Sequence, residues 1–376
     1  MGTGDDVRRM WRPRLIILQP TPYCNINCTY CYLPHRDERH LMSLEVLDAI
    51  KQKLFVKISP NAEPIIVWHA GEPMAAPLSW YRDAFELLKP GTPAGAIYRI
   101  QTNGISVSDE WIDFLSQTGI RIGVSIDGPP RFHDARRVTR QGRPTSSLVI
   151  RNLRKLQAAG LEPNVLSVLH PTHLSAAEEF YQFYREHQIY DVSFSIDEIT
   201  LANPSSSFSD ADYRAELTLF LLTLMKLAFA DGYPLRIREV ERVAGVLASG
   251  NPAYNEQTRP WDVVAVAANG DTSSFSPEFL GMRAFNFGNV LHHGADELFT
   301  NVLCKQVGEE IERGVSQCSR NCGYFNVCGG GSPSNKFFEN GSMSTSETLF
   351  CRLSVQAPMD ALRDFLRSAS QGGEVV

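Results

Sequence analysis

Three cysteines crowd into one short segment near the start of the chain, CNINCTYC, directly after an apolar run. They are Cys24, Cys28 and Cys31. A disulfide pair would use an even number of thiols, and a structural zinc site would want an even set of four ligands. An odd, closely spaced set indicates a metal site in which one coordination position stays open for a ligand, as it does in catalytic zinc centres.

The remaining cysteines lie far from this triplet, near the other end of the chain. They are Cys304, Cys318, Cys322, Cys328 and Cys351. The N-terminal segment MGTGDDVRRMWRPR lacks the apolar core of a secretory signal, so we expect a cytoplasmic protein whose thiols stay reduced. In a reducing compartment, clustered cysteines indicate metal ligands more often than disulfides.

The composition argues against two kinds of partner. The chain has 376 residues, of which 43% are hydrophobic, and its formal net charge is −6. Nucleic acid binding requires a basic surface, so we do not expect a nucleic acid partner. The longest apolar stretch, residues 217–230, contains Lys226 and falls short of the ~20 apolar residues of a membrane span. We interpret it as a buried helix and expect no membrane contact.

The elements that must position these cysteines follow a repeating pattern. Short, β-branched apolar runs, typical of parallel strands buried on both faces, occur at 15–19, 65–69, 97–101, 121–126, 164–169 and 191–196. Helical patterns separate them, including one that Ser108 caps and Gly119 terminates. Six such units predict an α/β fold, a partial (β/α)6 TIM barrel, with its chemistry on the loops after the strands. The triplet follows the first strand.

The pattern changes after residue 235, where turn signals such as SGNP, ANGD and GGGSP multiply. The second cysteine group lies in this irregular segment, which would pack poorly without a metal to hold it together. We therefore predict a partial barrel over residues 1–235 and a cysteine-rich domain over residues 236–376.

The triplet has the spacing C-x3-C-x2-C, with the aromatic Tyr30 before its third cysteine. In this it resembles the radical S-adenosylmethionine (SAM) enzymes. In that family three cysteines hold a [4Fe–4S] cluster whose open iron binds SAM, and one electron cleaves SAM to a 5′-deoxyadenosyl radical. The resemblance implies SAM, this cluster and an external one-electron donor of the flavodoxin or ferredoxin type. A zinc knuckle that borrows a distant fourth ligand is the alternative.

A second motif follows the second predicted strand. In the sequence WHAGEP, Gly71, Glu72 and Pro73 match the family's GGEP loop, which holds the amino group of SAM. Ala70 takes the place of the first glycine, and we expect it to be tolerated only with a negative φ. Alone, a Gly-Glu-Pro sequence is more often a simple turn.

Polar residues also follow the third and fourth predicted strands. Asn103 lies in QTNG, and Ser125 and Asp127 lie in SIDGP, where they resemble the family's contacts to the ribose and carboxylate of SAM. Arg137 matches the arginine of the family's HDxxR motif, which suits a bidentate contact with a carboxylate. Each residue alone is also typical of a turn or an exposed helix face. With Tyr30 they predict a SAM pocket at the strand ends.

Four of the later cysteines are spaced as a ligand set: Cys318, Cys322, Cys328 and Cys351. By spacing alone they favour zinc. Joined to the triplet, they resemble the SPASM/twitch-like extension of radical SAM enzymes, which in its full form has seven cysteines and two auxiliary clusters. Ser276 and Ser332 stand here where others carry cysteine, so the resemblance implies one auxiliary [4Fe–4S] cluster and two clusters in total. We expect Cys304 to be a core residue, or else a ligand.

The segments GGGSPSNKFFENGSM and FSPEFLG resemble the GRRM-type maturases, which act on ribosomally made precursor peptides. Members and close relatives join an aromatic ring carbon to the Cβ of a residue two positions on, forming a three-residue cyclophane by net two-electron oxidation. The alternatives are a formylglycine-forming anaerobic sulfatase maturase, a thioether-forming peptide maturase and a zinc-stapled binding protein. We expect no leader-recognition domain before Leu15, so that the peptide binds the barrel helices or the C-terminal domain.

Cross-linking of this kind releases a proton, which a general base must accept. The candidates are Glu278 and Asp271 in the C-terminal segment, and Asp197 at the end of the sixth predicted strand. Each is also typical of a surface or turn carboxylate. The loop at 197–210 follows that strand, so we expect it to border the substrate channel.

Overall fold

The computed structural model describes residues 10–370. Within them, nine strands form one sheet in the order β7-β6-β5-β4-β3-β2-β1-β8-β9, and only β9 is antiparallel to its neighbour. The strands are β1 (Leu15–Leu18), β2 (Ile65–Trp68), β3 (Ile97–Thr102), β4 (Arg121–Ser125), β5 (Asn164–Leu169), β6 (Asp191–Ile196), β7 (Arg236–Ile237), β8 (Val263–Val266) and β9 (Thr272–Ser274). The first six coincide with the predicted apolar runs, which confirms the α/β class and the partial parallel barrel.

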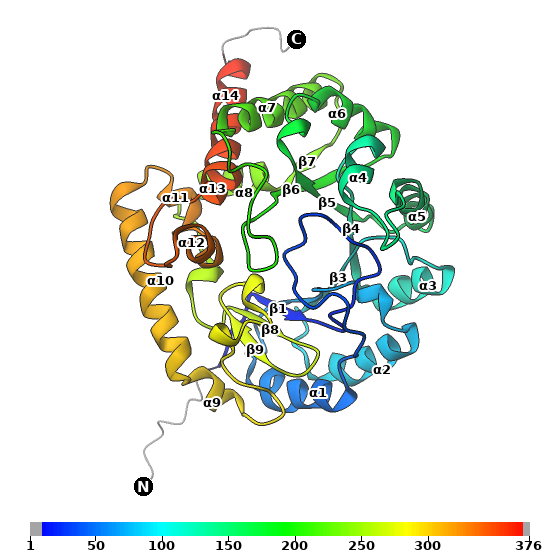
Figure 1. Ribbon diagram of the computed structural model, residues 1–376, viewed down its shortest axis with the longest axis vertical. Coiled ribbons are helices and arrows are strands. Elements are labelled where there is room, and N and C mark those ends of the chain that lie inside the picture. The colour runs from blue at the N-terminus through cyan, green and yellow to red at the C-terminus, as the bar shows by residue number, and fades with distance from the viewer. Residues whose placement is uncertain (1–9, 371–376) are drawn as a thin grey trace.

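Helices surround this sheet (Figure 1). Those of the barrel are α1 (Leu44–Ala49), α2 (Leu78–Leu88), α3 (Asp109–Thr118), α4 (Pro130–Arg136), α5 (Ser146–Ala158), α6 (Ala177–Glu186) and α7 (Arg214–Ala230). The predicted cap of α3 is confirmed, since the Ser108 side chain accepts a hydrogen bond from the backbone of Trp111 and Gly119 ends the helix at φ 68°. The predicted buried helix is α7, which packs between α6 and α14. No helix of the described chain is long and apolar enough to cross a membrane.

The sheet extends beyond the predicted barrel segment. Strand β7 pairs with β6, and β8 pairs in parallel with β1, with Leu15 opposite Val263. The indole of Trp11 also donates to the carbonyl of Trp261 at 2.7 Å. Residues after 235 therefore contribute strands to the barrel sheet before the chain reaches the second cysteine group. The sequence did not indicate this pairing, and the division into two domains stays a prediction.

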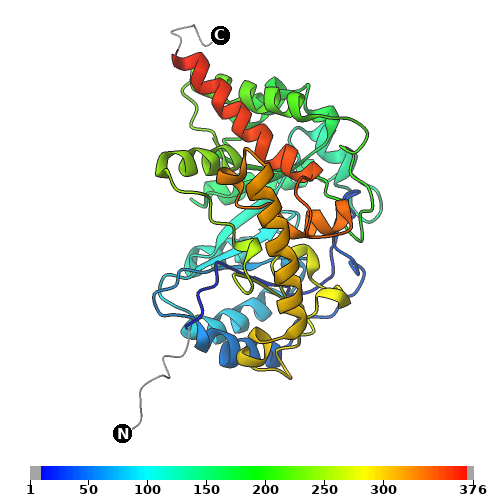
Figure 2. The ribbon, with the colours of Figure 1, turned by 90° about the vertical axis from the view of Figure 1, so that its left-hand side faces the viewer.

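The later helices pack against one side of the barrel. They are α8 (Arg238–Ser249), α9 (Ala295–Phe299), α10 (Val302–Asn321), α11 (Phe325–Cys328), α12 (Pro333–Asn340), α13 (Leu349–Cys351) and α14 (Ala357–Ser370). Figure 2 shows α10 and α14, in gold and red, crossing that side. In Figure 1 the loops after β1 (dark blue) and β6 (green) lie over the middle of the barrel. This arrangement brings the ends of the strands, α12 and the second cysteine group to one region.

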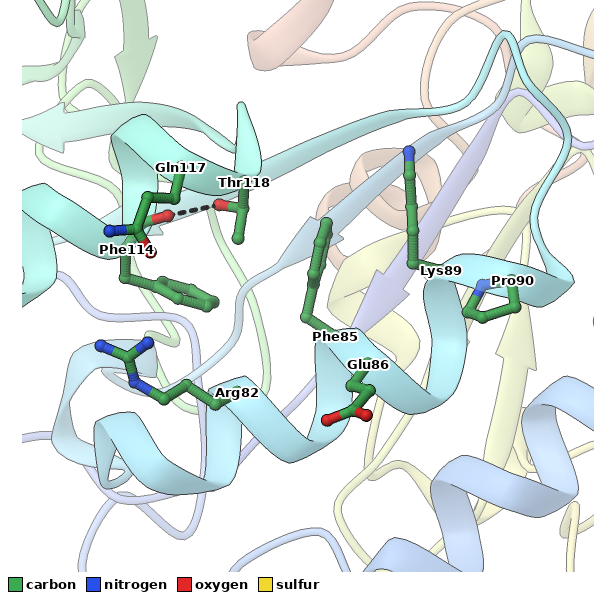
Figure 3. A pocket seen from close by; sticks show the side chains of 8 residues that line it. All are labelled: Arg82, Phe85, Glu86, Lys89, Pro90, Phe114, Gln117 and Thr118. Carbon is green, nitrogen blue, oxygen red and sulfur yellow. Dashed lines mark hydrogen bonds between the residues drawn. The ribbon is translucent and has the colours of Figure 1, made fainter.

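A groove of about 440 Å³ lies elsewhere, between α2 and α3. Figure 3 shows Phe85 and Phe114 in its wall, with Arg82 and Lys89 beside them. Helices in a βα repeat run antiparallel to the strands, so the C-terminal halves of α2 and α3 lie toward the start of the strands. The groove is therefore remote from the strand ends that carry the triplet.

Candidate active site

The cysteine triplet lies on the loop that follows β1, and backbone hydrogen bonds fix this loop to the segment after α4. The amide of Asn27 donates to the carbonyl of Val138 at 2.7 Å, and that of Thr29 to the carbonyl of Arg136 at 3.0 Å. Burial, together with the charges of Glu72, Cys28 and Cys31, raises the pKa of the Cys24 thiol to about 12. The three sulfurs are thus close enough to affect one another, and a metal is needed to stabilise their thiolates.

Two hydrogen-bond donors point at these sulfurs. The amide nitrogen of Asn103 lies 3.9 Å from Sγ of Cys24, and a guanidinium nitrogen of Arg137 lies 4.0 Å from Sγ of Cys28. Hydrogen bonds to ligand sulfurs are a means by which proteins tune iron–sulfur clusters. A set of three thiols with two such donors fits a cluster with one open iron.

The loop after β2 contacts the triplet loop directly. Gly71 has φ 89°, and a Cβ built on it would lie 2.2 Å from the carbonyl oxygen of Thr21, so only glycine fits. Ala70 has φ 67°, which corrects our expectation of a negative φ. Its close packing (it is 2% exposed) holds this left-handed conformation despite a cost of about 1–2 kcal/mol.

Glu72 uses its side chain to tie this loop to β3. Its carboxylate accepts hydrogen bonds from the amide of Met74 at 2.9 Å, the hydroxyl of Thr102 at 2.6 Å and the amide of Asn103 at 2.8 Å. Burial raises the pKa of Glu72. Three donors already bind the carboxylate, so Glu72 fixes the conformation of the loop. The backbone carbonyls of residues 70–73 are then the groups available to bind the ammonium group of a ligand.

Asp127 binds two other residues of the predicted SAM pocket. Its Oδ2 accepts a hydrogen bond from the Tyr30 hydroxyl at 2.5 Å and forms an ion pair with Nε of Arg137 at 2.9 Å, while its Oδ1 accepts from the amide of Val168 at 2.8 Å. Although burial alone would raise it, the Arg137 charge holds the pKa of Asp127 below its ordinary value. Ser125 accepts a hydrogen bond from the amide of Gln101 at 3.0 Å. Asp127 is fully buried, and these contacts orient Tyr30 and Arg137.

A cavity of about 470 Å³ lies next to Tyr30 at the ends of β5 and β6. Its lining includes Tyr30, Arg136, His170, His173, Asp197 and Ser205–Ser207. Asp197 forms a buried ion pair with Arg136 at 2.9 Å and accepts further hydrogen bonds from Ser206 and Ser207. Because its carboxylate is paired in this way, Asp197 holds the loop after β6 in place and is poorly suited to accept a proton.

The other two predicted bases lie in different surroundings. Asp271 is in the turn between β8 and β9, where its carboxylate accepts hydrogen bonds from Asn269 and Asn289, each at 2.9 Å. It is therefore a turn carboxylate. Glu278 accepts hydrogen bonds on Oε2 from the hydroxyls of Ser276 and Ser334, the latter at 3.1 Å. Its Oε1 makes no hydrogen bond within the described residues.

Glu198, which was not among the residues predicted from sequence, forms a pair with Glu278. Its Oε2 accepts a hydrogen bond from Asn335 at 2.8 Å, and Asn335 follows Ser334 in the first turn of α12. The two carboxylates thus share the positive end of one helix. Burial, and next the charge of Glu278, raises the pKa of Glu198 to about 8. The one signal in the sequence was its position directly after Asp197 at a strand end.

This carboxylate pair faces the triplet loop. Burial, followed by the charges of Glu278, Cys31 and Glu198, raises the pKa of Tyr32 well above its ordinary value. The Tyr32 hydroxyl lies 3.2 Å from Nε2 of His69, and burial lowers the pKa of His69 to about 4, so the imidazole is neutral near pH 7. The carboxylates of Glu278 and Glu198 therefore act on Tyr32, the residue that directly follows Cys31.

The second cysteine group has N–H donors on three of its four sulfurs. The amide of Gly331 donates to Cys328 at 3.1 Å, and the amide of Thr348 donates to Cys351 at 3.4 Å. The ammonium of Lys336 donates to Cys318 at 3.3 Å. With Cys322 at the C-terminal end of α10, this donor set fits an anionic metal–thiolate cluster. Within the described residues, no three Cys, His, Asp or Glu side chains are placed to hold a single metal ion.

Cys304 lies apart from this group. It is 2% exposed among apolar side chains, and burial raises the pKa of its thiol to about 12. The two serines that stand where cysteines were expected both lie next to Ser334. The hydroxyl oxygens of Ser276 and Ser332 are 2.8 Å and 2.9 Å from that of Ser334. A hydroxyl network that binds Glu278 thus occupies this position.

This chain is similar to known proteins in sequence and in fold. The Radical SAM superfamily sequence model matches residues 18–184. An uncharacterized protein, sll1766 of Synechocystis sp., is 33% identical over 93% of this chain and 91% of its own length. A cysteine-type anaerobic sulfatase-maturating enzyme of Clostridium novyi is 24% identical over 90% of this chain and 92% of its own. The solved structure of native anSMEcpe with bound AdoMet and Cp18Cys peptide superposes with a TM-score of 0.75 at 20% identity, covering 96% of this chain and 99% of that one.

The family match begins at the end of β1 and includes the triplet loop and the loops after β2, β3 and β4. The solved structure shares the fold of nearly the whole chain. The chain therefore belongs to the radical SAM superfamily and is an enzyme.

Proposed function

We propose that this enzyme is a maturase that cross-links a ribosomally made precursor peptide, joining an aromatic ring carbon to a Cβ as a three-residue cyclophane. The observation that carries the proposal is the carboxylate pair, Glu198 and Glu278, which the first turn of α12 holds opposite Tyr32. We assign the role of proton acceptor to this pair.

The cofactors follow from the donor sets. We assign one [4Fe–4S] cluster to Cys24, Cys28 and Cys31, and SAM to Tyr30, the loop of Gly71, Glu72 and Pro73, and Asn103, Ser125, Asp127 and Arg137. When bound, this pair supplies a 5′-deoxyadenosyl radical that removes a hydrogen from a substrate carbon. We assign an auxiliary [4Fe–4S] cluster, a one-electron acceptor, to Cys318, Cys322, Cys328 and Cys351. A flavodoxin or ferredoxin is the proposed external donor.

The chain's own residues complete the reaction by removing the proton that ring closure releases. Burial and the negative charge of Glu278 both disfavour the ionised form of Glu198. They raise its pKa to about 8, so Glu198 favours its protonated form at neutral pH. We assign the base to Glu278, whose Oε1 makes no hydrogen bond among the described residues.

A formylglycine-forming sulfatase maturase is the second candidate. The Clostridium novyi relative, a cysteine-type anaerobic sulfatase-maturating enzyme, aligns with 90% of this chain. The hydroxyl network of Ser276, Ser332 and Ser334 argues against it, since it stands where the resemblance places ligands of a further cluster. A thioether-forming maturase uses the same cofactors and remains a third outcome of the test.

The test is to incubate the anaerobically reconstituted enzyme with SAM, a reductant and a candidate precursor peptide, sought among small open reading frames next to its gene. We expect a product lighter by two hydrogens, with a cross-link mapped by fragmentation to a ring and a Cβ. An aldehyde that reacts with a hydrazine probe would establish formylglycine instead, and a sulfur–carbon bond would establish a thioether.

Glu278→Gln should lower the yield of cross-linked peptide more than tenfold while 5′-deoxyadenosine still forms, because only proton removal is affected. Asp271→Asn is the matched control and should behave as wild type. Equal activity of both variants would refute Glu278 as the base.

A further inference from the structure

Lys336 is a buried cation in the second cysteine group. It lies on α12, is 2% exposed, and its ammonium group donates to Sγ of Cys318 at 3.3 Å. It forms no ion pair with any carboxylate of residues 10–370. A buried charge is strongly unfavourable unless an opposite charge compensates it. A neutral thiol does not supply that charge, whereas an anionic cluster on Cys318 does.

The fold makes room for this ammonium group beside the sulfur. Gly314 lies one helical turn before Cys318 on the same face of α10. A Cβ on Gly314 would lie 3.0 Å from Nζ of Lys336, 2.9 Å from the carbonyl oxygen of Thr345 and 2.1 Å from that of Met343. The absence of a side chain there therefore lets α12 and the segment before Cys351 approach the same helix face.

We propose that Lys336 raises the reduction potential of the auxiliary cluster by placing a fixed positive charge against its Cys318 ligand. This inference rests on the proposed function, in which the cluster gains the one electron that ring closure releases while the proton goes to Glu278. A cluster with four thiolate ligands becomes more negative when it takes up an electron, so a nearby cation stabilises the reduced form more than the oxidised form. Arg242, whose charge reaches Cys328, is exposed and more strongly screened.

The experiment measures the potential of the auxiliary cluster alone. Cys24, Cys28 and Cys31 are replaced by alanine so that no cluster forms on the triplet, and the reconstituted protein is titrated with redox mediators while its EPR signal is recorded. Lys336→Met removes the charge at similar volume, and Lys336→Gln removes it but keeps an N–H donor. Lys305→Met, an exposed lysine on α10, is the matched control.

We expect both Lys336 variants to disfavour reduction at least tenfold, a fall of about 59 mV in the midpoint potential of a one-electron couple. Lys305→Met should leave the potential unchanged. If Lys336→Gln retained the original potential, the hydrogen bond and not the charge would be responsible, and the proposal would be overturned.

Failure of this inference is distinguishable from failure of the proposed function, because the titration needs neither peptide nor SAM. If the variant without Cys24, Cys28 and Cys31 bound no iron, the auxiliary cluster would not exist and the proposed function would fail. A parent cluster that is lost in both Lys336 variants, with the helical circular dichroism preserved, would assign Lys336 to cluster assembly and refute a tuning role.

Discussion

Replacing Gly71 with alanine should disrupt the contact between the loop after β2 and the triplet loop. Two effects add. A φ of 89° is unfavourable for alanine by about 1–2 kcal/mol, and the new Cβ would lie 2.2 Å from the carbonyl of Thr21. The carbonyl belongs to rigid backbone between two prolines, so the loop that carries Cys24 must move. We expect a total loss of more than about 3 kcal/mol in the free energy of unfolding.

Gly119→Ala separates the two effects. Gly119 has φ 68°, and nothing lies within 4 Å of the position that a Cβ would take there, so this variant experiences only the backbone strain of about 1–2 kcal/mol. Denaturant unfolding of both variants gives the difference, and the rate of 5′-deoxyadenosine formation reports on the site. We expect this rate to fall more than tenfold in Gly71→Ala and to stay unchanged in Gly119→Ala.

Two results together would refute this prediction. The free energy of unfolding would fall equally in Gly71→Ala and Gly119→Ala, and Gly71→Ala would cleave SAM at the wild-type rate. The loop would then accommodate the methyl group without moving the cysteines. Ala70, which already has φ 67°, shows that strain alone is tolerated in this loop, so the contact with Thr21 is the decisive term.

Three other predictions concern the clusters and the carboxylate pair. Replacing Cys24, Cys28 and Cys31 with alanine should abolish 5′-deoxyadenosine formation and leave the auxiliary iron in place, and persistence of that activity would contradict the SAM-cluster assignment. The wild-type protein should bind about eight irons per chain, as two cubanes, and a measured value near twelve would show that the ligand assignment is incomplete. The pKa of Glu198 rises from 4.5 to about 8 on folding, so the folded state binds more protons and wild-type stability falls between these pH values by at most about 5 kcal/mol. Glu198→Gln should lack this fall in denaturant unfolding at pH 5 and pH 8, and parallel curves for the two proteins would disprove the shift.

The sequence was sufficient for the strands that are buried on both faces. Such strands must be almost continuously apolar, so their positions could be predicted from residue type alone. Strand β8, with the residues VVAV, has the same character, but turn signals around it masked its membership of the sheet. Its pairing with β1 depends on contacts that residue types do not encode.

The residues of the site that belong to short sequence motifs could be predicted from the sequence. Each motif lies at a strand end, which a parallel sheet brings to one edge. Of the carboxylate pair, Glu278 was among the predicted bases. Glu198 was missed because Asn335, which donates a hydrogen bond to it, is 137 residues away in sequence. The expectation for Ala70 was wrong because tertiary packing outweighed the intrinsic preference of alanine for negative φ.

The pairing of β1 with β8 also has a consequence for synthesis of the chain. The bond from Trp11 to Trp261 joins residues 250 positions apart, so the ribosome works for roughly 12–50 s after making β1 before its partner emerges. During that time one edge of the strand that leads into the triplet is unpaired and able to join other chains. We expect the nascent protein to need a chaperone in this interval, and iron to be inserted after release from the ribosome.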